Sequence, residues 1–311
     1  MTTAGIAAEH SRLATRAALA SVALALVLLA AKVWGAYQTD STAMLGSLAD
    51  TALDLIASLT TLAGVRMAAV PADRDHRFGH GKAEALAALV QVALITVSAA
   101  GIAWHAADRL IHGGTPEAMG VGISVSLFAI AATFLLLLYQ RRVISRTASV
   151  AILTDNVHYK SDLMLNGAVI VALVLDQALR VRGADALFGI AIAVWLLWGG
   201  FRASSEAINQ LMDREWPEDE RQAFLAACAE HPELRGIHDL RTRKSGTLRF
   251  AQFHVWVPAD WTVREAHERL DRIEEKLQER FPGTEILIHV DPEGQTDRET
   301  LLPSNITERA T

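Results

Sequence analysis

Six long apolar runs fill the chain before about residue 205, and they constrain its fold more than any other feature. The runs lie at about residues 17–38, 43–67, 83–108, 117–140, 148–175 and 184–205. Each reaches the roughly 20 residues that a helix needs to cross a ~30 Å hydrocarbon core. The first run has the basic start of a signal peptide, but no small-residue cleavage site follows it. The sequence therefore predicts six transmembrane helices.

Basic residues near the helix ends predict the orientation of these helices. One side of the membrane receives nine of them: Arg12, Arg16, Arg66, Arg74, Arg77, Lys82, Arg141, Arg142 and Arg146. The other side receives only Arg109, Arg180 and Arg182, or four residues if Lys32 is added. Because cytoplasmic loops carry the excess of Lys and Arg, both termini are predicted to be cytoplasmic. Trp34, Tyr37 and Trp104 then fall near the outer helix ends, where aromatic belts form.

The pattern after Asp213 is that of a soluble domain. We expect, in order, a helix from Pro217 to about His231, strands Gly236–Arg243 and Leu248–Val257 around a Lys244-Ser245-Gly246 turn, a helix Thr262–Arg280 and a strand Thr284–Val290. This αββαβ order predicts a small α+β domain whose sheet is covered by helices on one side. The predicted division is a membrane domain (1–212), a cytoplasmic domain (213–293) and a disordered polar tail (294–311).

Two polar pairs interrupt the apolar runs. Asp50 and Asp54 stand four residues apart in the second run, and His158 and Asp162 repeat this spacing in the fifth. Residues four apart lie on one face of a helix, one turn from each other. An aspartate at a bilayer centre costs about 2.5–3.5 kcal/mol, so such groups usually serve a function. The alternative is a pair of structural contacts that hydrogen-bond between helices.

Three carboxylates and one imidazole on two facing helices can bind a metal ion. Four N/O ligands suit a tetrahedral divalent ion such as zinc and admit other first-row ions. The metal requires ionised aspartates and a neutral histidine, so its binding releases protons and proton binding releases the metal. Such a site couples metal movement to proton movement in the opposite direction.

Two further groups have ligand chemistry. The loop from Pro71 to Lys82 contains Asp73, His76 and His80, although Arg74 and Arg77 beside them oppose a cation, and a solvated loop is the alternative. The soluble domain places histidines and one carboxylate on its strands and long helix: His238, His254, His267, His289 and Asp291. Strand alternation places His289 and Asp291 on the same face. These residues indicate a metal cluster more than a catalytic site.

Other function classes have less support. The single cysteine, Cys228, excludes an internal disulfide and a Cys-Cys metal knuckle, and we interpret it as a small buried residue on a helix. Lys and Arg do not collect on one face, so no nucleic-acid partner is expected. An intramembrane metalloenzyme has no H-E-x-x-H run to support it. A metal-gated channel and a non-transporting membrane metal sensor stay open as alternatives to a transporter.

Six segments together resemble the cation diffusion facilitator family: LADTALDL, PADRDHRFGHGKAEALAAL, HYKSDLMLNGA, ADALFGI, HDLRTRKSG and ILIHVDP. The resemblance covers about residues 15–293. It implies six membrane helices, cytoplasmic termini and a metallochaperone-like C-terminal domain in a homodimer. It also implies a transport site (Asp50, Asp54, His158, Asp162), a loop site (Asp73, His76, His80), a cytoplasmic two-metal site (His238, His254, His267, His289, Asp291) and an intersubunit charge interlock (Lys82, Asp213). For this last pair, the residues alone favoured a snorkelling lysine and a capping aspartate.

The function that the resemblance implies is a metal/proton antiporter in the bacterial inner membrane, and not an enzyme. A histidine in the third ligand position looks like the branch that handles zinc and cadmium. We therefore expect export of zinc from the cytoplasm, with Fe2+ or Cd2+ as further substrates and zinc also as a regulatory ligand. A rocking change would expose the site outward, where protonation releases the metal.

Overall fold

The computed structural model describes residues 3–39, 42–112, 120–179 and 184–294. The chain divides into two compact units, one of His10–Ile208 and one of Met1–Glu9 with Asn209–Thr311. Each unit is described by itself below. Arg180, Arg182 and the predicted disordered tail after residue 294 lie outside the described residues.

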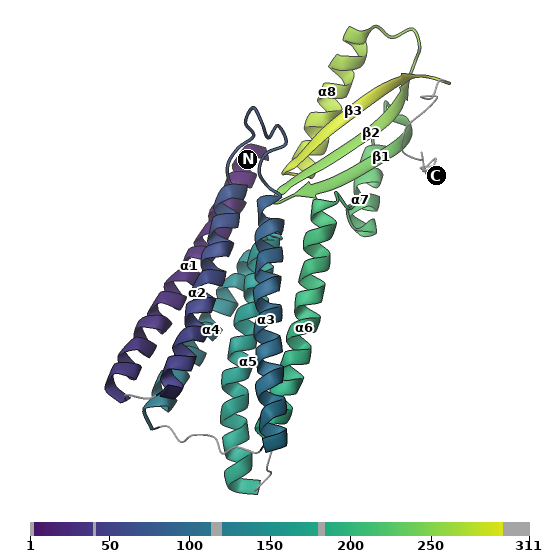
Figure 1. The fold of residues 1–311 in the computed structure, drawn as a ribbon. Coiled ribbons are helices and arrows are strands. Elements are labelled where there is room, and N and C mark those ends of the chain that lie inside the picture. Colours follow the sequence, from purple (N-terminus) through teal and green to yellow (C-terminus); the bar gives the residue numbers. More distant parts are fainter. Residues whose placement is uncertain (1–2, 40–41, 113–119, 180–183, 295–311) are drawn as a thin grey trace. The chain divides into compact units, whose positions relative to one another are not determined.

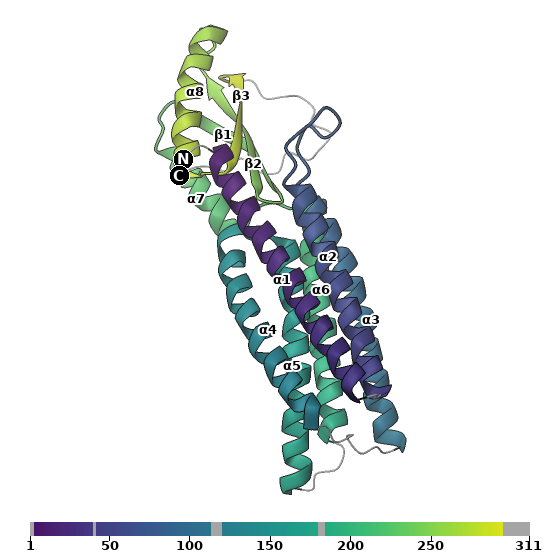
Figure 2. The same ribbon diagram turned by 90° about the vertical axis from the view of Figure 1, so that its left-hand side faces the viewer.

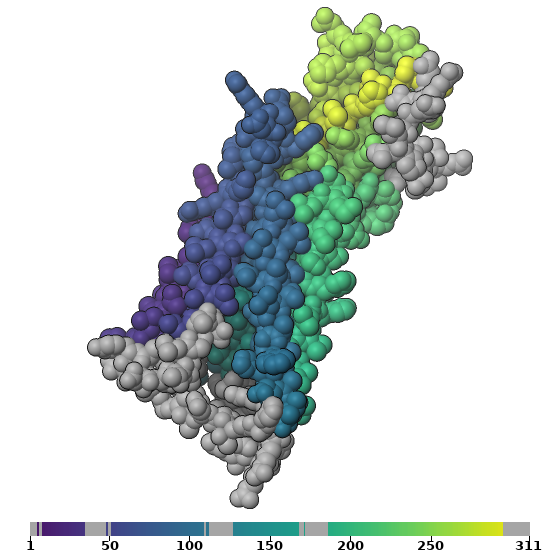
Figure 3. All heavy atoms as spheres, viewed as in Figure 1, coloured from purple at the N-terminus to yellow at the C-terminus, as the bar shows by residue number. Residues whose placement is uncertain are grey.

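Six long helices form the first unit and run alongside one another in both ribbon views (Figures 1 and 2). They are α1 (Thr3–Thr39), α2 (Thr42–Ala68), α3 (Ala83–His112), α4 (Gly120–Thr147), α5 (Val150–Leu179) and α6 (Ala184–Leu211). All six predicted membrane segments are therefore helical over their described residues. Helices α2, α3 and α6 form one face of this unit in the space-filling view (Figure 3).

Five of these helices are long and apolar enough to cross a membrane, namely α1, α2, α3, α4 and α6. Within the described residues α5 adds no further span, and its first half carries Asp155, Lys160 and Asp162. The outward faces of the bundle carry large apolar side chains, such as Trp104, Leu135 and Phe201, that are about two-thirds or more exposed. This pattern is expected where lipid takes the place of water.

Small residues let these helices approach closely. A Cβ atom on Gly64 of α2 would collide with the Cβ of Ala87 on α3. The buried interior also holds many polar side chains, including Gln91, Gln140 and Asp155, none of which is measurably exposed. In a membrane protein such groups must find their hydrogen-bond partners inside the bundle.

The second unit has the predicted αββαβ order. Its elements are α7 (Glu218–Ala229), β1 (Arg235–Ser245), β2 (Leu248–Val257), α8 (Val263–Arg280) and β3 (Thr284–Pro292). The sheet order is β1-β2-β3, with β1 antiparallel and β3 parallel to β2. The core joins Phe224 of α7, Phe253 of β2 and Leu277 of α8, so both helices pack on the same face of the sheet. The α+β fold class is confirmed, and Cys228 is buried on α7 as predicted.

The predicted hairpin turn Lys244-Ser245-Gly246 begins two residues too early. Lys244 and Ser245 pair with Arg249 and Leu248 in the sheet, so the turn consists of residues 246 and 247. Gly246 has φ +59° at the first turn position, where a two-residue type II′ turn requires a positive φ. The long helix begins as predicted, because Thr262 and Glu265 form a reciprocal capping box at its start.

Candidate functional site

Three ligand side chains converge inside the helical bundle: Asp54 of α2 with His158 and Asp162 of α5, here called the triad. His158 Nε2 lies 3.1 Å from Asp54 Oδ1 and 3.9 Å from Asp162 Oδ2. The ligand atoms of all three lie within 4.8 Å of one another, close enough to share one ion. Asp50 lies one turn before Asp54 on α2, and its side chain is outside the described residues. The expected meeting of the two polar helices is therefore confirmed.

The triad borders a cavity of about 600 Å³ that runs along the bundle. Its wall on α3 includes Ile95, Ser98, Ile102 and His105, which step by three and four residues along one face. At 1.5 Å per residue this wall extends for roughly 15 Å. The cavity therefore leads from the triad towards the bundle end at which α3 ends and α6 begins.

Two residues of this cavity were missed as site residues. Lys32 was weighed only as a loop charge, yet it lines the cavity and its ammonium donates to Thr51 Oγ1 at 2.5 Å. His105 is not among the predicted site residues, yet it also lines the cavity. A lysine inside an apolar run was the available signal for the first, because intramembrane charges usually mark a pathway.

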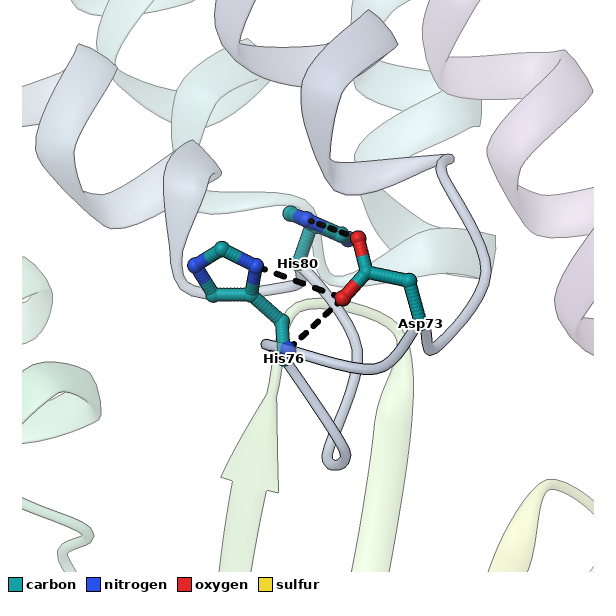
Figure 4. A group of neighbouring side chains, drawn as sticks. All are labelled: Asp73, His76 and His80. Atoms are coloured by element: carbon teal, nitrogen blue, oxygen red, sulfur yellow. Dashed lines mark hydrogen bonds and ion pairs between the residues drawn. The ribbon is translucent and has the colours of Figure 1, made fainter.

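A second cluster occupies the loop between α2 and α3, where Asp73, His76 and His80 face one another (Figure 4). Asp73 Oδ1 lies 3.5 Å from His76 Nδ1, and Asp73 Oδ2 lies 3.4 Å from His80 Nε2. The Nδ1 of His80 is 3.3 Å from the Val70 carbonyl oxygen. If Nδ1–H donates to that carbonyl, Nε2 keeps the lone pair that a metal needs.

The backbone prepares Asp73 for this arrangement. Its carboxylate accepts hydrogen bonds from the backbone N–H groups of His76 at 2.7 Å and Asp75 at 2.9 Å. These bonds, the one from His76 foremost, hold the pKa of Asp73 below its usual value. Gly79, at φ +77°, takes a left-handed conformation just before His80. All three predicted loop residues are thus brought together.

The third cluster lies on the sheet of the second unit, on the face away from the helices. Pairing aligns one histidine from each strand, because His238 is opposite His254 and His254 is opposite His289. Asp291 follows on β3, two residues beyond His289 and on the same face. Buried neighbours such as Phe253 and Val255 alternate with His254, so the helices cover the other face.

Asp291 is the centre of this cluster. Its Oδ2 lies 3.2 Å from His238 Nε2 and 3.0 Å from His254 Nδ1, while its Oδ1 lies 3.5 Å from His289 Nε2. The carboxylate is buried, with 6% of Asp291 exposed. A carboxylate with different imidazoles at its two oxygens has the geometry of a bridging ligand.

His267 does not join this cluster within one chain. It lies exposed on α8, with its Nδ1 3.4 Å from Asp271 Oδ1. Asp239 is a neighbour that sequence reasoning missed, since its Oδ2 lies 4.0 Å from His254 Nε2. Asp239 has φ +51° where the pairing of β1 slips, and Arg241 holds its carboxylate with a 2.8 Å hydrogen bond. Sequence alternation gives no sign of such a bulge.

The predicted partners Lys82 and Asp213 belong to different units, so their pairing stays a prediction. Within its own unit Asp213 Oδ1 lies 3.5 Å from Arg243 Nη1. Asp213 follows α6 with φ +55°, a left-handed conformation common just beyond helix ends.

Comparison with known proteins supplies the family. Residues 18–212 match the model of the cation efflux transmembrane domain, and residues 216–293 match the cytoplasmic domain of cation efflux proteins. The cation-efflux pump FieF of Serratia proteamaculans (strain 568) is 43% identical over 284 residues, covering 91% of this chain and 94% of the relative. FieF of Cronobacter sakazakii (strain ATCC BAA-894) is 43% identical over 287 residues, with the same coverage.

Among solved structures, the metal-bound C-terminal domain of the CzcD transporter from Thermotoga maritima is 26% identical, with a TM-score of 0.25. The match covers 26% of this chain and 100% of the CzcD domain. The two domain models together span most of the chain, and the FieF relatives align over nearly its whole length. The chain therefore belongs to the cation efflux family, also called the cation diffusion facilitators, and is a multi-pass membrane protein for the efflux of divalent metal cations.

Proposed function

We propose that this chain is a zinc/proton antiporter whose transport site is the triad together with Asp50. The observation that carries the proposal is the convergence of Asp54, His158 and Asp162 at one end of a cavity between apolar helices. Carboxylate and imidazole ligands inside a membrane are costly to keep without a cation. A cavity that begins at these ligands gives the ion a route away from them.

Proton coupling follows from the chemistry of the ligands. A bound divalent ion needs the three aspartates ionised and His158 neutral. Protons that reach the same atoms compete directly with the metal, since His158 Nε2 already lies 3.1 Å from Asp54 Oδ1. Each transport cycle then exchanges protons for one metal ion. Zinc is the proposed main cargo because a mixed N/O set of four ligands suits its tetrahedral preference, and Fe2+ and Cd2+ are proposed further cargoes.

The experiment is flux in liposomes that contain a zinc-sensitive dye and a pH dye. Zinc uptake accompanied by opposite proton movement, with both lost in Asp162→Ala, is the expected result. Glu206→Gln is the matched control, because Glu206 is an exposed carboxylate on α6 that does not line the cavity. Zinc flux without proton movement would favour a channel, and zinc binding without flux would favour a sensor. Because the relatives are efflux pumps, they give no support to an enzymatic function for this chain.

The two other clusters are proposed regulatory sites for cytoplasmic zinc. The loop cluster (Asp73, His76 and His80) and the sheet cluster (His238, His254, His289 and Asp291) would bind cytoplasmic metal, since both termini are proposed to lie in the cytoplasm. In the sheet cluster, Asp291 would bridge two ions. His267 is a proposed ligand from the second copy in a homodimer, since within one chain it lies on α8, which packs against the opposite face of the sheet. Lys82 and Asp213 are proposed to form the charge interlock of that homodimer, which we place in the bacterial inner membrane.

A further inference from the structure

A second buried carboxylate on α5 lies one turn before the triad and does not line the cavity. Asp155 is not measurably exposed. Its oxygens accept hydrogen bonds from three helices: Ser21 Oγ of α1 at 2.6 Å, Gln91 Nε2 of α3 at 3.1 Å and Gln140 Nε2 of α4 at 2.7 Å. We call these four residues the Asp155 cluster.

The Asp155 cluster ties five helices together at one level of the bundle. Gln140 Nε2 also lies 3.0 Å from Ser21 Oγ, and Gln91 Oε1 accepts a hydrogen bond from Thr61 of α2. Gln91 lies eight residues after the start of α3, and Asp155 five residues after the start of α5. At 1.5 Å per residue both lie roughly 8–12 Å from the same end of the bundle.

The triad lies between the Asp155 cluster and the cavity. None of the four cluster residues lines the cavity, which leads from the triad the other way, past Ile102 and His105. Tyr159 adds a further seal at the level of the triad, since its hydroxyl lies 2.8 Å from Ser58 Oγ and donates to the Ser21 carbonyl oxygen at 3.0 Å. A cavity therefore lies on one side of the triad, and side-chain hydrogen bonds close the bundle on the other.

We propose that Asp155 is a gating residue: its hydrogen bonds to Ser21, Gln91 and Gln140 close the metal path where α3 and α5 begin, and they break when the triad opens to that end. The inference rests on the proposed function only in taking the triad as the transport site. Hydrogen-bonded side chains can exchange their partners for water, whereas an apolar seal gains nothing from hydration. Once freed, the carboxylate presents a ligand to the divalent ion that passes it.

Two substitutions separate gating from a structural role. Asp155→Asn has the same shape and can still pair with both glutamines after one of their amides turns, but its neutral group gains less from hydration and is a poorer metal ligand. It should favour the closed side and slow metal transport by about tenfold, a factor that corresponds to about 1.4 kcal/mol in the barrier. Asp155→Ala removes all three hydrogen bonds and should open that side.

The readout is the labelling rate of single cysteines by a hydrophilic maleimide, in full-length protein with Cys228→Ser. Ala88→Cys reports the closed side, because Ala88 is fully buried on α3 three residues before Gln91. Ile102→Cys reports the cavity. We expect Asp155→Ala to raise labelling at position 88 and lower it at position 102, and Asp155→Asn to do the reverse.

Three outcomes would overturn the inference: equal labelling at position 88 in all three proteins, a rise at both positions in Asp155→Ala as general loosening would give, or parental transport rates in Asp155→Asn. Labelling requires neither zinc nor a proton gradient. Failure of the proposed function would appear instead as a parent protein that moves no zinc or no protons in liposomes.

Discussion

Replacing Asp291 with asparagine tests whether the sheet cluster binds metal as its geometry indicates. The substitution keeps the size of the side chain and removes the charge that lies 3.0–3.5 Å from three imidazoles. Because the two carboxylate oxygens face different histidines, asparagine cannot replace them both as metal ligands. Only one of its two terminal atoms is an acceptor, and that atom is neutral.

The expected loss is at least about 100-fold in zinc affinity, since even the partners of metal ligands are worth 10–100-fold. For one ion at 100 times its Kd, binding stabilises the folded domain by about 2.7 kcal/mol. A 100-fold weaker site at the same zinc concentration gives RT ln 2, about 0.4 kcal/mol. The difference of about 2.3 kcal/mol corresponds to roughly 9–18 °C in the melting temperature of a domain of this size.

The assay is calorimetric titration with zinc together with thermal melting, in full-length protein whose other clusters are disabled by Asp54→Asn and His76→Ala. Asp260→Asn is the control, because Asp260 is an exposed carboxylate in the loop between β2 and α8. A Kd for Asp291→Asn within threefold of the parent value would refute a metal-binding role for this carboxylate.

Four further predictions concern the second unit. Phe224→Ala should lower its free energy of unfolding by about 3–5 kcal/mol in denaturant titrations, because the buried ring contacts three other aromatic rings edge-on; a loss below 1 kcal/mol would contradict that packing. Thr262→Ala should cost about 1 kcal/mol through loss of the cap. Hydrogen bonds that Thr262 donates to the Glu265 carboxylate, first from its backbone N–H and then from its hydroxyl, lower the pKa of Glu265. The negative charge of Glu265 therefore stabilises the fold at pH values above the pKa that this residue has in the unfolded chain. The advantage of the parent over Glu265→Gln should therefore vanish as pH falls through the lowered pKa. Burial raises the pKa of Cys228 to about 12, so thiol reagents should react with it at pH 8 only after unfolding; rapid labelling of the native protein would contradict this.

Much of the fold could be predicted because its signals are local. The length of the apolar runs predicted six helices, and apolar residues spaced by three and four predicted α8 nearly to the residue. The structure adds the capping box at Thr262. The hairpin turn was misplaced because Lys244 and Ser245 resemble turn residues. Only the backbone reveals that Gly246 alone supplies the positive φ.

The sequence predicted those parts of the site that depend only on the spacing of residues within one helix or one strand. Four-residue spacing singled out the residues of the triad, and strand alternation placed His289 and Asp291 on one face. The partners of Asp155 were out of reach, since they come from helices 15 to 134 residues away in the chain. The bulge that turns Asp239 towards His254 likewise depends on how β1 pairs with β2 and leaves no periodic trace.

The loop cluster allows one more test, in which the backbone is the decisive factor. Asp73 is already ionised and oriented by two backbone N–H groups, so a cation would find its carboxylate in place. Asp73→Asn should weaken zinc binding at this loop by about 10–100-fold, measured in protein that carries Asp54→Asn and Asp291→Asn. Asp75→Asn is the matched control, because this neighbouring carboxylate lies outside the cluster. Equal losses in the two variants would mean that the loop attracts zinc by its net charge alone, and the geometry of Figure 4 would then not be a binding site.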